Sequence, residues 1–269
     1  MLDLKYPVLM VHGMGFRDRK HLCYWGRIPK VLENAGCRVF FGDQDSNGSI
    51  EDNGRFLAEH IRKIASENNI ERFNVIAHCK GGLDMRYAIS SEGAGDLVAS
   101  LSTISTPHNG SVTVDKLLRF PDPLVKLGCK ACDIWWKILG DKKPGTYDTI
   151  HSFTTAAAAK FNEDNPDNED IYYQSFAFTF SSAFSDFFLW ISHLVVKMFE
   201  GENDGLLAPR AVKWTNFRGV YTGATKRGIS HCDEVDMRRM PLTRKKAEGI
   251  TDITDFYVEL VSELEQMGY

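Results

Sequence analysis

The sequence has no long hydrophobic run, no excess of basic residues and no segment with the features of a secretion signal. Its 269 residues carry a net charge of −4, which argues against a nucleic-acid binder that acts mainly by neutralising phosphates. The longest apolar stretch, Phe187 to Phe199, includes His193 and Lys197 and is shorter than the roughly 20 residues that cross a bilayer. The start, MLDLKYPVLMVHG, has no basic segment or cleavage site, so we expect a cytoplasmic protein, or a secreted one whose leader has been removed.

Repeats, low-complexity segments and a dense cysteine framework are also missing. Six cysteines are present, but their spacing fits no small disulfide-stabilised scaffold, so we predict mostly reduced thiols. A composition of 43% hydrophobic and 25% charged residues is ordinary for a globular protein. At roughly 150 residues per domain the length suggests about two domains, yet one α/β sheet with its helices fills the same length. We predict a single domain over residues 1–269.

Short apolar runs of strand type alternate with segments of helical periodicity. The predicted strands are Val8–His12, Arg38–Phe41, Phe73–Ala77, Leu101–Ser105, Gln174–Phe180 and Gly219–Thr222. Apolar residues recur at helical spacing in Glu51–Asn69 and again from Ile253 to Leu264, as in amphipathic helices. Strands separated by helices predict an α/β fold with a mostly parallel sheet covered by helices on both faces.

The segment Phe73 to Gly82, FNVIAHCKGG, combines a strand, a tight turn and the start of a helix. This is the context of a nucleophile elbow, with Cys79 at the position of the nucleophile. Ala77 and Gly81 are small because a larger side chain would clash with the strained turn. A buried structural cysteine after a strand gives the same local pattern, so the motif alone does not decide between the two readings.

Three further features favour catalysis. His12-Gly13-Met14-Gly15 follows the first strand, where the backbone N–H groups of Met14 and Lys80 would form an oxyanion hole. Asp204 lies in a turn after an apolar segment, and His231 follows the last strand. The order nucleophile, acid, base along the chain is that of α/β-hydrolases, although Asp204 is also compatible with an ordinary turn residue.

The chain resembles the bacterial family I triacylglycerol lipases of the pseudomonad type, within the α/β-hydrolase superfamily. The matching stretches run in order across most of the chain: Tyr6–Met14, Tyr24-Trp25, Ala77–Leu83, Arg86-Tyr87, Ser105–Ser111, Asn203–Leu206 and His231–Val235. The resemblance implies an α/β-hydrolase fold with Cys79 as nucleophile, Asp204 as acid, His231 as base, and Met14 and Lys80 as oxyanion donors. The implied partner is an ester or lipid substrate, with transient contact to a lipid interface and no nucleic acid.

The resemblance also implies a helical lid and one structural calcium ion, although the chemistry itself requires no cofactor. We place the lid within Phe120–Gly140, inside a cap segment of about residues 115–165. Trp135 and Trp136 there suit either contact with acyl chains or simple burial. The calcium ligands are expected to be Asp233, two residues after the base, and Asp186; backbone carbonyls or waters would have to complete the six or more oxygens that calcium takes.

The main departure from that family is the cysteine, because the family nucleophile is serine. A thiolate would attack an ester and form a thioester intermediate. Three functions stay open: an esterase or lipase with a Cys–His–Asp triad, an acyltransferase that passes the acyl group to an alcohol or amine, and a catalytically silent lipid-binding relative. Free acid as the product distinguishes the first from the second, and acylation of the protein distinguishes both from the third.

Replacing Cys79 with serine tests whether the site is built for oxygen or for sulfur. The surrounding motifs match serine enzymes, so we expect Cys79→Ser to raise the rate of ester hydrolysis at least tenfold, which is about 1.4 kcal/mol of activation free energy. Steady-state kinetics on p-nitrophenyl esters measure this. A folded serine variant without activity would show instead that the site is adapted to thioester chemistry.

Overall fold

The computed structural model describes residues 1–15, 23–139, 141–181, 185–245 and 247–269, with the side chains of residues 135, 136 and 139 left out. The predicted lid tryptophans, Trp135 and Trp136, therefore lie outside the side chains described, and Gly140 lies outside the described residues. All six cysteines belong to the described part of the chain, where Cys37, Cys79, Cys129, Cys132 and Cys232 are free thiols.

Within these residues the core of the fold is one six-stranded sheet with the order β2-β1-β3-β4-β5-β6. Each pair of neighbouring strands is parallel. The strands are β1 (Val8–Val11), β2 (Val39–Phe41), β3 (Phe73–His78), β4 (Val98–Ile104), β5 (Tyr172–Phe178) and β6 (Phe217–Tyr221). Each overlaps one of the six predicted strands, so the predicted parallel α/β fold is confirmed.

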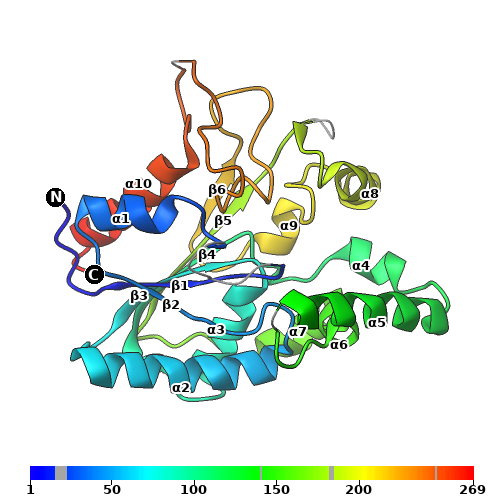
Figure 1. The fold of residues 1–269 in the computed structure, drawn as a ribbon, viewed down its shortest axis with the longest axis horizontal. Coiled ribbons are helices and arrows are strands. Elements are labelled where there is room, and N and C mark those ends of the chain that lie inside the picture. The colour runs from blue at the N-terminus through cyan, green and yellow to red at the C-terminus, as the bar shows by residue number, and fades with distance from the viewer. Residues whose placement is uncertain (16–22, 140, 182–184, 246) are drawn as a thin grey trace.

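Helices cover both faces of the sheet (Figure 1). On one face α1 (Ile28–Ala35) and α10 (Ile253–Gln266) pack with Val8 and Met10. On the other face α2 (Ile50–Asn68) and α3 (Lys80–Ser90) pack with Leu9 and Val11. Successive side chains of β1 thus alternate between two apolar cores, as the period of a strand requires.

The sequence determines the ends of the longest of these helices. The Ser49 side chain accepts a hydrogen bond from the amide of Asp52 and caps the N-terminus of α2. Glu51 and Asp52 place negative charge in the first turn, where the helix dipole favours it. Asn69 ends the helix in a left-handed conformation.

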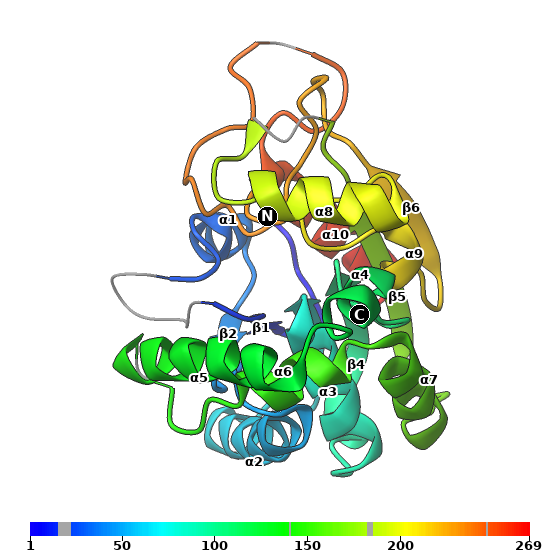
Figure 2. The same cartoon turned by 90° about the vertical axis from the view of Figure 1, so that its right-hand side faces the viewer.

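Among the described residues, four helices lie between β4 and β5, in the region where the cap segment of about residues 115–165 was predicted. They are α4 (Val112–Leu117), α5 (Asp122–Leu139), α6 (Thr146–Ser152) and α7 (Thr155–Asp164). A short 3-10 helix, η1 (Gly95–Leu97), precedes β4, and α8 (Trp190–Glu200) and α9 (Pro209–Val212) follow β5. Figure 2 shows α5 and α8 at the same end of the molecule, with the ends of the strands between them.

The chain after α5 is anchored to the loop after β2. The Asp141 carboxylate accepts hydrogen bonds from the amides of Ser46 and Asn47, at 3.0 and 2.8 Å, and from the Ser46 hydroxyl at 2.9 Å. This contact fixes one end of the helix predicted as a lid. No helix among the described residues has the length and apolar character needed to cross a membrane.

Candidate active site

The predicted nucleophile lies at a sharp turn between β3 and α3. Cys79 has φ 52° and ψ −130°, a backbone conformation that non-glycine residues rarely adopt and that costs of order 1–3 kcal/mol. Its amide donates a 2.9 Å hydrogen bond to the carbonyl of Ile104 at the end of β4. A side chain at Gly81 would clash with the carbonyl oxygen of His12. The elbow predicted from the sequence is therefore present, but Gly81 is small because a side chain would meet the carbonyls of Val11 and His12 at the end of β1, not the strained turn itself.

The loop after β1 packs directly against this turn. A Cβ atom at Gly13 would lie 2.7 Å from the Cβ of Cys79, so only glycine allows the approach. Met14 follows in this loop, and Lys80 is the first residue of α3. The two predicted oxyanion donors thus come from the segments that flank Cys79.

The side chain of Lys80 is buried in an ion pair within α3. Its Nζ lies 2.6 and 2.8 Å from the two carboxylate oxygens of Asp84, which also accepts a 2.9 Å hydrogen bond from Asn53. Burial raises the pKa of Asp84 to about 6, although Lys80 opposes that shift. The pair fixes the first turn of α3, which directly follows Cys79.

The predicted base and acid are hydrogen-bonded and buried. His231 Nδ1 lies 2.8 Å from Asp204 Oδ2, and the amide of His231 donates a 2.8 Å hydrogen bond to the Asp204 carbonyl. The other Asp204 oxygen accepts from the amides of Leu206 and Leu207 at 2.8 and 2.7 Å. Burial opposes ionisation, but His231 and these amides outweigh it and lower the pKa of Asp204.

The environment of His231 favours its protonated form. Burial disfavours the charged imidazole, yet the charges of Asp204, Cys79 and Glu234 prevail and raise the pKa of His231 well above its ordinary value. Cys79 and His231 are far apart in the sequence, and the fold brings them close enough for their charges to interact. Cys79, His231 and Asp204 thus belong to one buried cluster, in which His231 is hydrogen-bonded to Asp204.

The sequence interpretation missed a second buried histidine–carboxylate pair, His78 and Glu234, beside the pair of His231 and Asp204. His78 Nε2 lies 3.0 Å from Glu234 Oε2, and His78 Nδ1 lies 2.6 Å from the Tyr24 hydroxyl. The rings of His78 and His231 are 4.4 Å apart. Burial lowers the pKa of His78, and His231 lowers it further. His78 thus supports the site from the elbow. The position of Glu234 three residues after His231 was the one available signal in the sequence.

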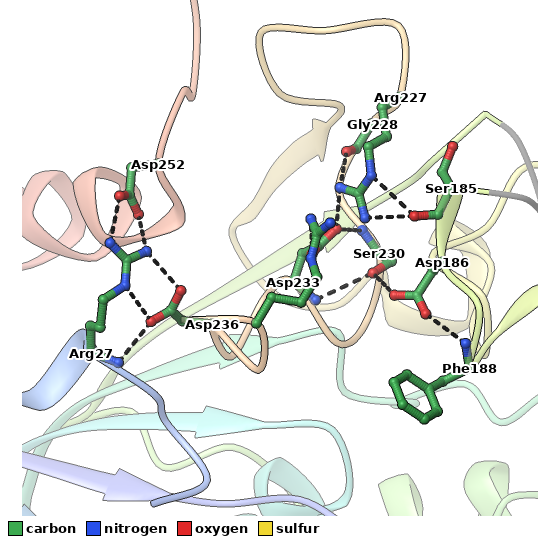
Figure 3. A network of polar contacts seen from close by, with 11 residues as sticks. Arg27, Ser185, Asp186, Phe188, Arg227, Gly228, Ser230, Asp233, Asp236 and Asp252 are labelled. Carbon is green, nitrogen blue, oxygen red and sulfur yellow. Dashed lines mark hydrogen bonds and ion pairs between the residues drawn. The ribbon is translucent and has the colours of Figure 1, made fainter. Parts of the chain in front are cut away.

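The residues predicted to bind calcium lie close together but do not fit a calcium ion. Asp233 and Asp186 both contact Ser230 (Figure 3). However, Arg227 and Arg238 donate to the two carboxylate oxygens of Asp233. Calcium requires six to eight oxygen ligands, whereas the charged partners of Asp233 are cations.

The fold and this group of residues define an α/β-hydrolase. The chain belongs to the palmitoyl protein thioesterase family, whose model matches residues 7–236. Triacylglycerol lipase 2 of Saccharomyces cerevisiae is 29% identical over 260 residues, which cover 91% of this chain and 74% of the yeast protein. Triacylglycerol lipase of Burkholderia plantarii is 28% identical over 180 residues, which cover 60% of this chain and 48% of that protein.

Solved lipase structures share the whole fold. The mature lipase BlEst2 of Bacillus licheniformis superposes with a TM-score of 0.69 at 20% identity, covering 98% of this chain and 94% of its own. The Staphylococcus hyicus lipase gives a TM-score of 0.70 at 16% identity, with 99% and 97% covered. The chain is thus a hydrolase of the lipase and esterase group in the α/β-hydrolase superfamily, as predicted.

The Asp204→Asn variant tests the base and its carboxylate together. Without the negative charge of Asp204, burial dominates and the pKa of His231 should fall from its raised value, so the imidazole loses its proton at a lower pH than in the native protein. We expect kcat for ester hydrolysis to fall roughly a thousandfold or more. NMR titration of His231 and steady-state kinetics measure the two effects. An unchanged His231 pKa would contradict the assignment.

Proposed function

We propose that this protein hydrolyses carboxylic esters with Cys79 as nucleophile, His231 as base and Asp204 as the orienting acid. The observation that carries the proposal is the 2.8 Å bond between His231 and Asp204, together with the strained elbow that presents Cys79. The proposal includes the cysteine as nucleophile and a relation to the pseudomonad-type family I lipases. It also includes a location in the cytoplasm and a reaction that needs no cofactor.

The proposed reaction has two steps of acyl transfer. The proton shared by Cys79 and His231 lies on His231 at the start, because the surroundings favour the protonated imidazole. The thiolate sulfur attacks the ester carbonyl carbon, and the C–O bond breaks while His231 gives its proton to the leaving alcohol. Water then gives a proton to the neutral His231 and its oxygen attacks the thioester; the C–S bond breaks, and Cys79 leaves as a thiolate beside the protonated His231. Amides of Met14 and Lys80 would stabilise the oxyanion of each tetrahedral intermediate.

The surface around the strand ends favours a lipid substrate. On α5, Leu124, Leu127, Ile134 and Ile138 are all exposed, and their spacing places them on one face of the helix. Phe187 and Phe188, just before α8, are 81% and 80% exposed. Exposed apolar patches of this kind mark contacts with lipids or proteins, and we assign α5 as the lid over an acyl site.

The names of the relatives support two classes of acyl substrate. The triacylglycerol lipases point to oxygen esters, and the family description points to acyl thioesters. We propose oxygen esters of lipids as the substrate. Rates on p-nitrophenyl palmitate and on palmitoyl-coenzyme A compare the two classes directly.

Acyl transfer is the second candidate, and the cysteine is the observation that favours it. A thioester intermediate can pass its acyl group to an alcohol or amine as well as to water. Product analysis in the presence of an added alcohol distinguishes the two reactions, because hydrolysis gives the free acid and transfer gives a new ester.

His231→Ala and Cys79→Ala test the proposed function itself. Each should reduce ester hydrolysis to the level without enzyme, because neither nucleophile nor base has a substitute in the proposed mechanism. Circular dichroism confirms that the variants are folded. If either variant retains near-native activity, the assignment of the triad is wrong; if the native protein hydrolyses neither probe and gains no acyl group, it is a silent relative.

Removing the exposed aromatic side chains before α8 tests the lipid surface. The double variant Phe187→Ser/Phe188→Ser should hydrolyse a long-chain ester in vesicles at least tenfold more slowly, since burying one such side chain contributes roughly 1.5–3 kcal/mol. Hydrolysis of soluble p-nitrophenyl acetate should stay unchanged. Met267→Ser, an exposed apolar residue after α10, is the control. Equal losses on both substrates would contradict a role in lipid contact.

A further inference from the structure

Arg227 joins two loops that meet beside the predicted base. Its Nε and Nη2 donate to the carbonyl oxygen of Ser185 at 3.2 and 3.0 Å, and its Nη1 lies 2.5 Å from Asp233 Oδ2. Figure 3 shows the guanidinium group between the two segments. Ser185 lies in the segment before α8, whereas Asp233 lies two residues after His231. One cation thus links both segments.

The carboxylate of Asp233 is buried, and its hydrogen bonds shape the turn before His231. Its Oδ2 also accepts a 3.1 Å hydrogen bond from the amide of Ser230, and its Oδ1 accepts from Arg238 Nε at 2.9 Å. The Ser230 hydroxyl in turn donates to Asp186 at 2.6 Å. Ser230 is therefore held from both sides, and the next residue is His231.

The two arginines are not equivalent. The side chain of Arg227 is 20% exposed and that of Arg238 is 39% exposed, against 1% for Asp233. Arg227 is also the one that reaches Ser185. A planar guanidinium can bind a carboxylate on one edge and a carbonyl on another, which are the oxygen types that a calcium ion would gather.

We propose that Arg227 is a positioning residue for His231 and that its guanidinium takes the place of the structural calcium expected from the resemblance to family I lipases. This inference rests on the proposed function, because it assumes that His231 is the base. The protein then needs no calcium ion to hold the loop of His231. Loss of Arg227 leaves the buried Asp233 with the more exposed Arg238 and frees the Ser185 segment.

The experiment compares two variants. Arg227→Met removes the charge at similar length, and Arg227→Lys keeps the charge but lacks the planar guanidinium that contacts both Asp233 and the carbonyl of Ser185. Arg218→Met is the matched control, since Arg218 is part-exposed and pairs with Glu263 of α10. Melting temperature is measured in chelator and in millimolar calcium chloride. The kinetic constants kcat and KM are measured on soluble p-nitrophenyl butyrate.

The native protein should melt at the same temperature in chelator and in calcium. Arg227→Met should melt lower and lose roughly ten- to a hundredfold in kcat, as about 1 Å of misplacement does, with KM changed less than about twofold. Arg227→Lys should recover part of the kcat, and Arg218→Met should keep native kinetics. A purely structural role would lower the melting temperature and leave the kcat of the folded enzyme unchanged.

A native melting temperature that rises by several degrees in calcium would overturn the proposal, since ligand binding to the folded state stabilises it. Native kcat in folded Arg227→Met would overturn it as well. If that variant does not fold, Arg227→Lys decides: reduced kcat at native KM supports the proposal, and native kcat contradicts it. The melting comparison does not depend on ester hydrolysis, so failure of the proposed function is recognised separately by inactive native protein.

Discussion

The strained backbone of Cys79, with φ 52° and ψ −130°, is the constraint on which the site depends. The conformation presents the thiol at the start of α3, and it persists because the surroundings leave no alternative. Gly13 and Gly81 allow the loop after β1 and the first turn of α3 to approach within contact distance. A hydrogen bond to Ile104 fixes the amide of Cys79 to the end of β4. Three strands thus converge on one strained residue.

The other half of the site depends on pairing buried charges. The segment from Arg227 to Asp236 consists of turns and one isolated β-bridge at Gly228, and backbone hydrogen bonds tie it to Thr179 and Asp204. Ion pairs add to these bonds: Asp204 binds His231, Arg227 binds Asp233, and Arg27 binds Asp236 at 2.7 Å. Breaking a buried pair by removing one partner leaves an uncompensated charge, which costs several kcal/mol. The loop therefore keeps its shape as long as each charge keeps its partner.

The fold could be predicted from the sequence because short apolar runs and helical periodicity are local signals. The predicted start of β4 at Leu101 was three residues late for a physical reason. Ser100 and Ser102 are buried in the sheet and hydrogen-bond to Asn74 and Gln174, so the strand does not read as a continuous apolar run. Buried polar residues whose hydrogen-bond partners lie on neighbouring strands leave no recognisable pattern in the local sequence.

The same limit applies to the site. The order of Cys79, Asp204 and His231 along the chain is the basis of the predicted triad, because the order of such residues follows from the topology of the fold. The partners of Asp233 and Glu234 were not predictable. Arg227 and His78 contact these carboxylates only because of the conformation of the loops. From the sequence alone, a carboxylate two residues after His231 could bind either a calcium ion or an arginine.

The central claim is that Cys79 carries the acyl group, and the most direct test is the mass of the intact protein after brief exposure to p-nitrophenyl butyrate. The account predicts one added butyryl group on the native protein, mapped to the peptide that contains Cys79, removed by hydroxylamine and missing from Cys79→Ala. An acyl group on another residue, or turnover of the ester by Cys79→Ala at the native rate, would contradict it.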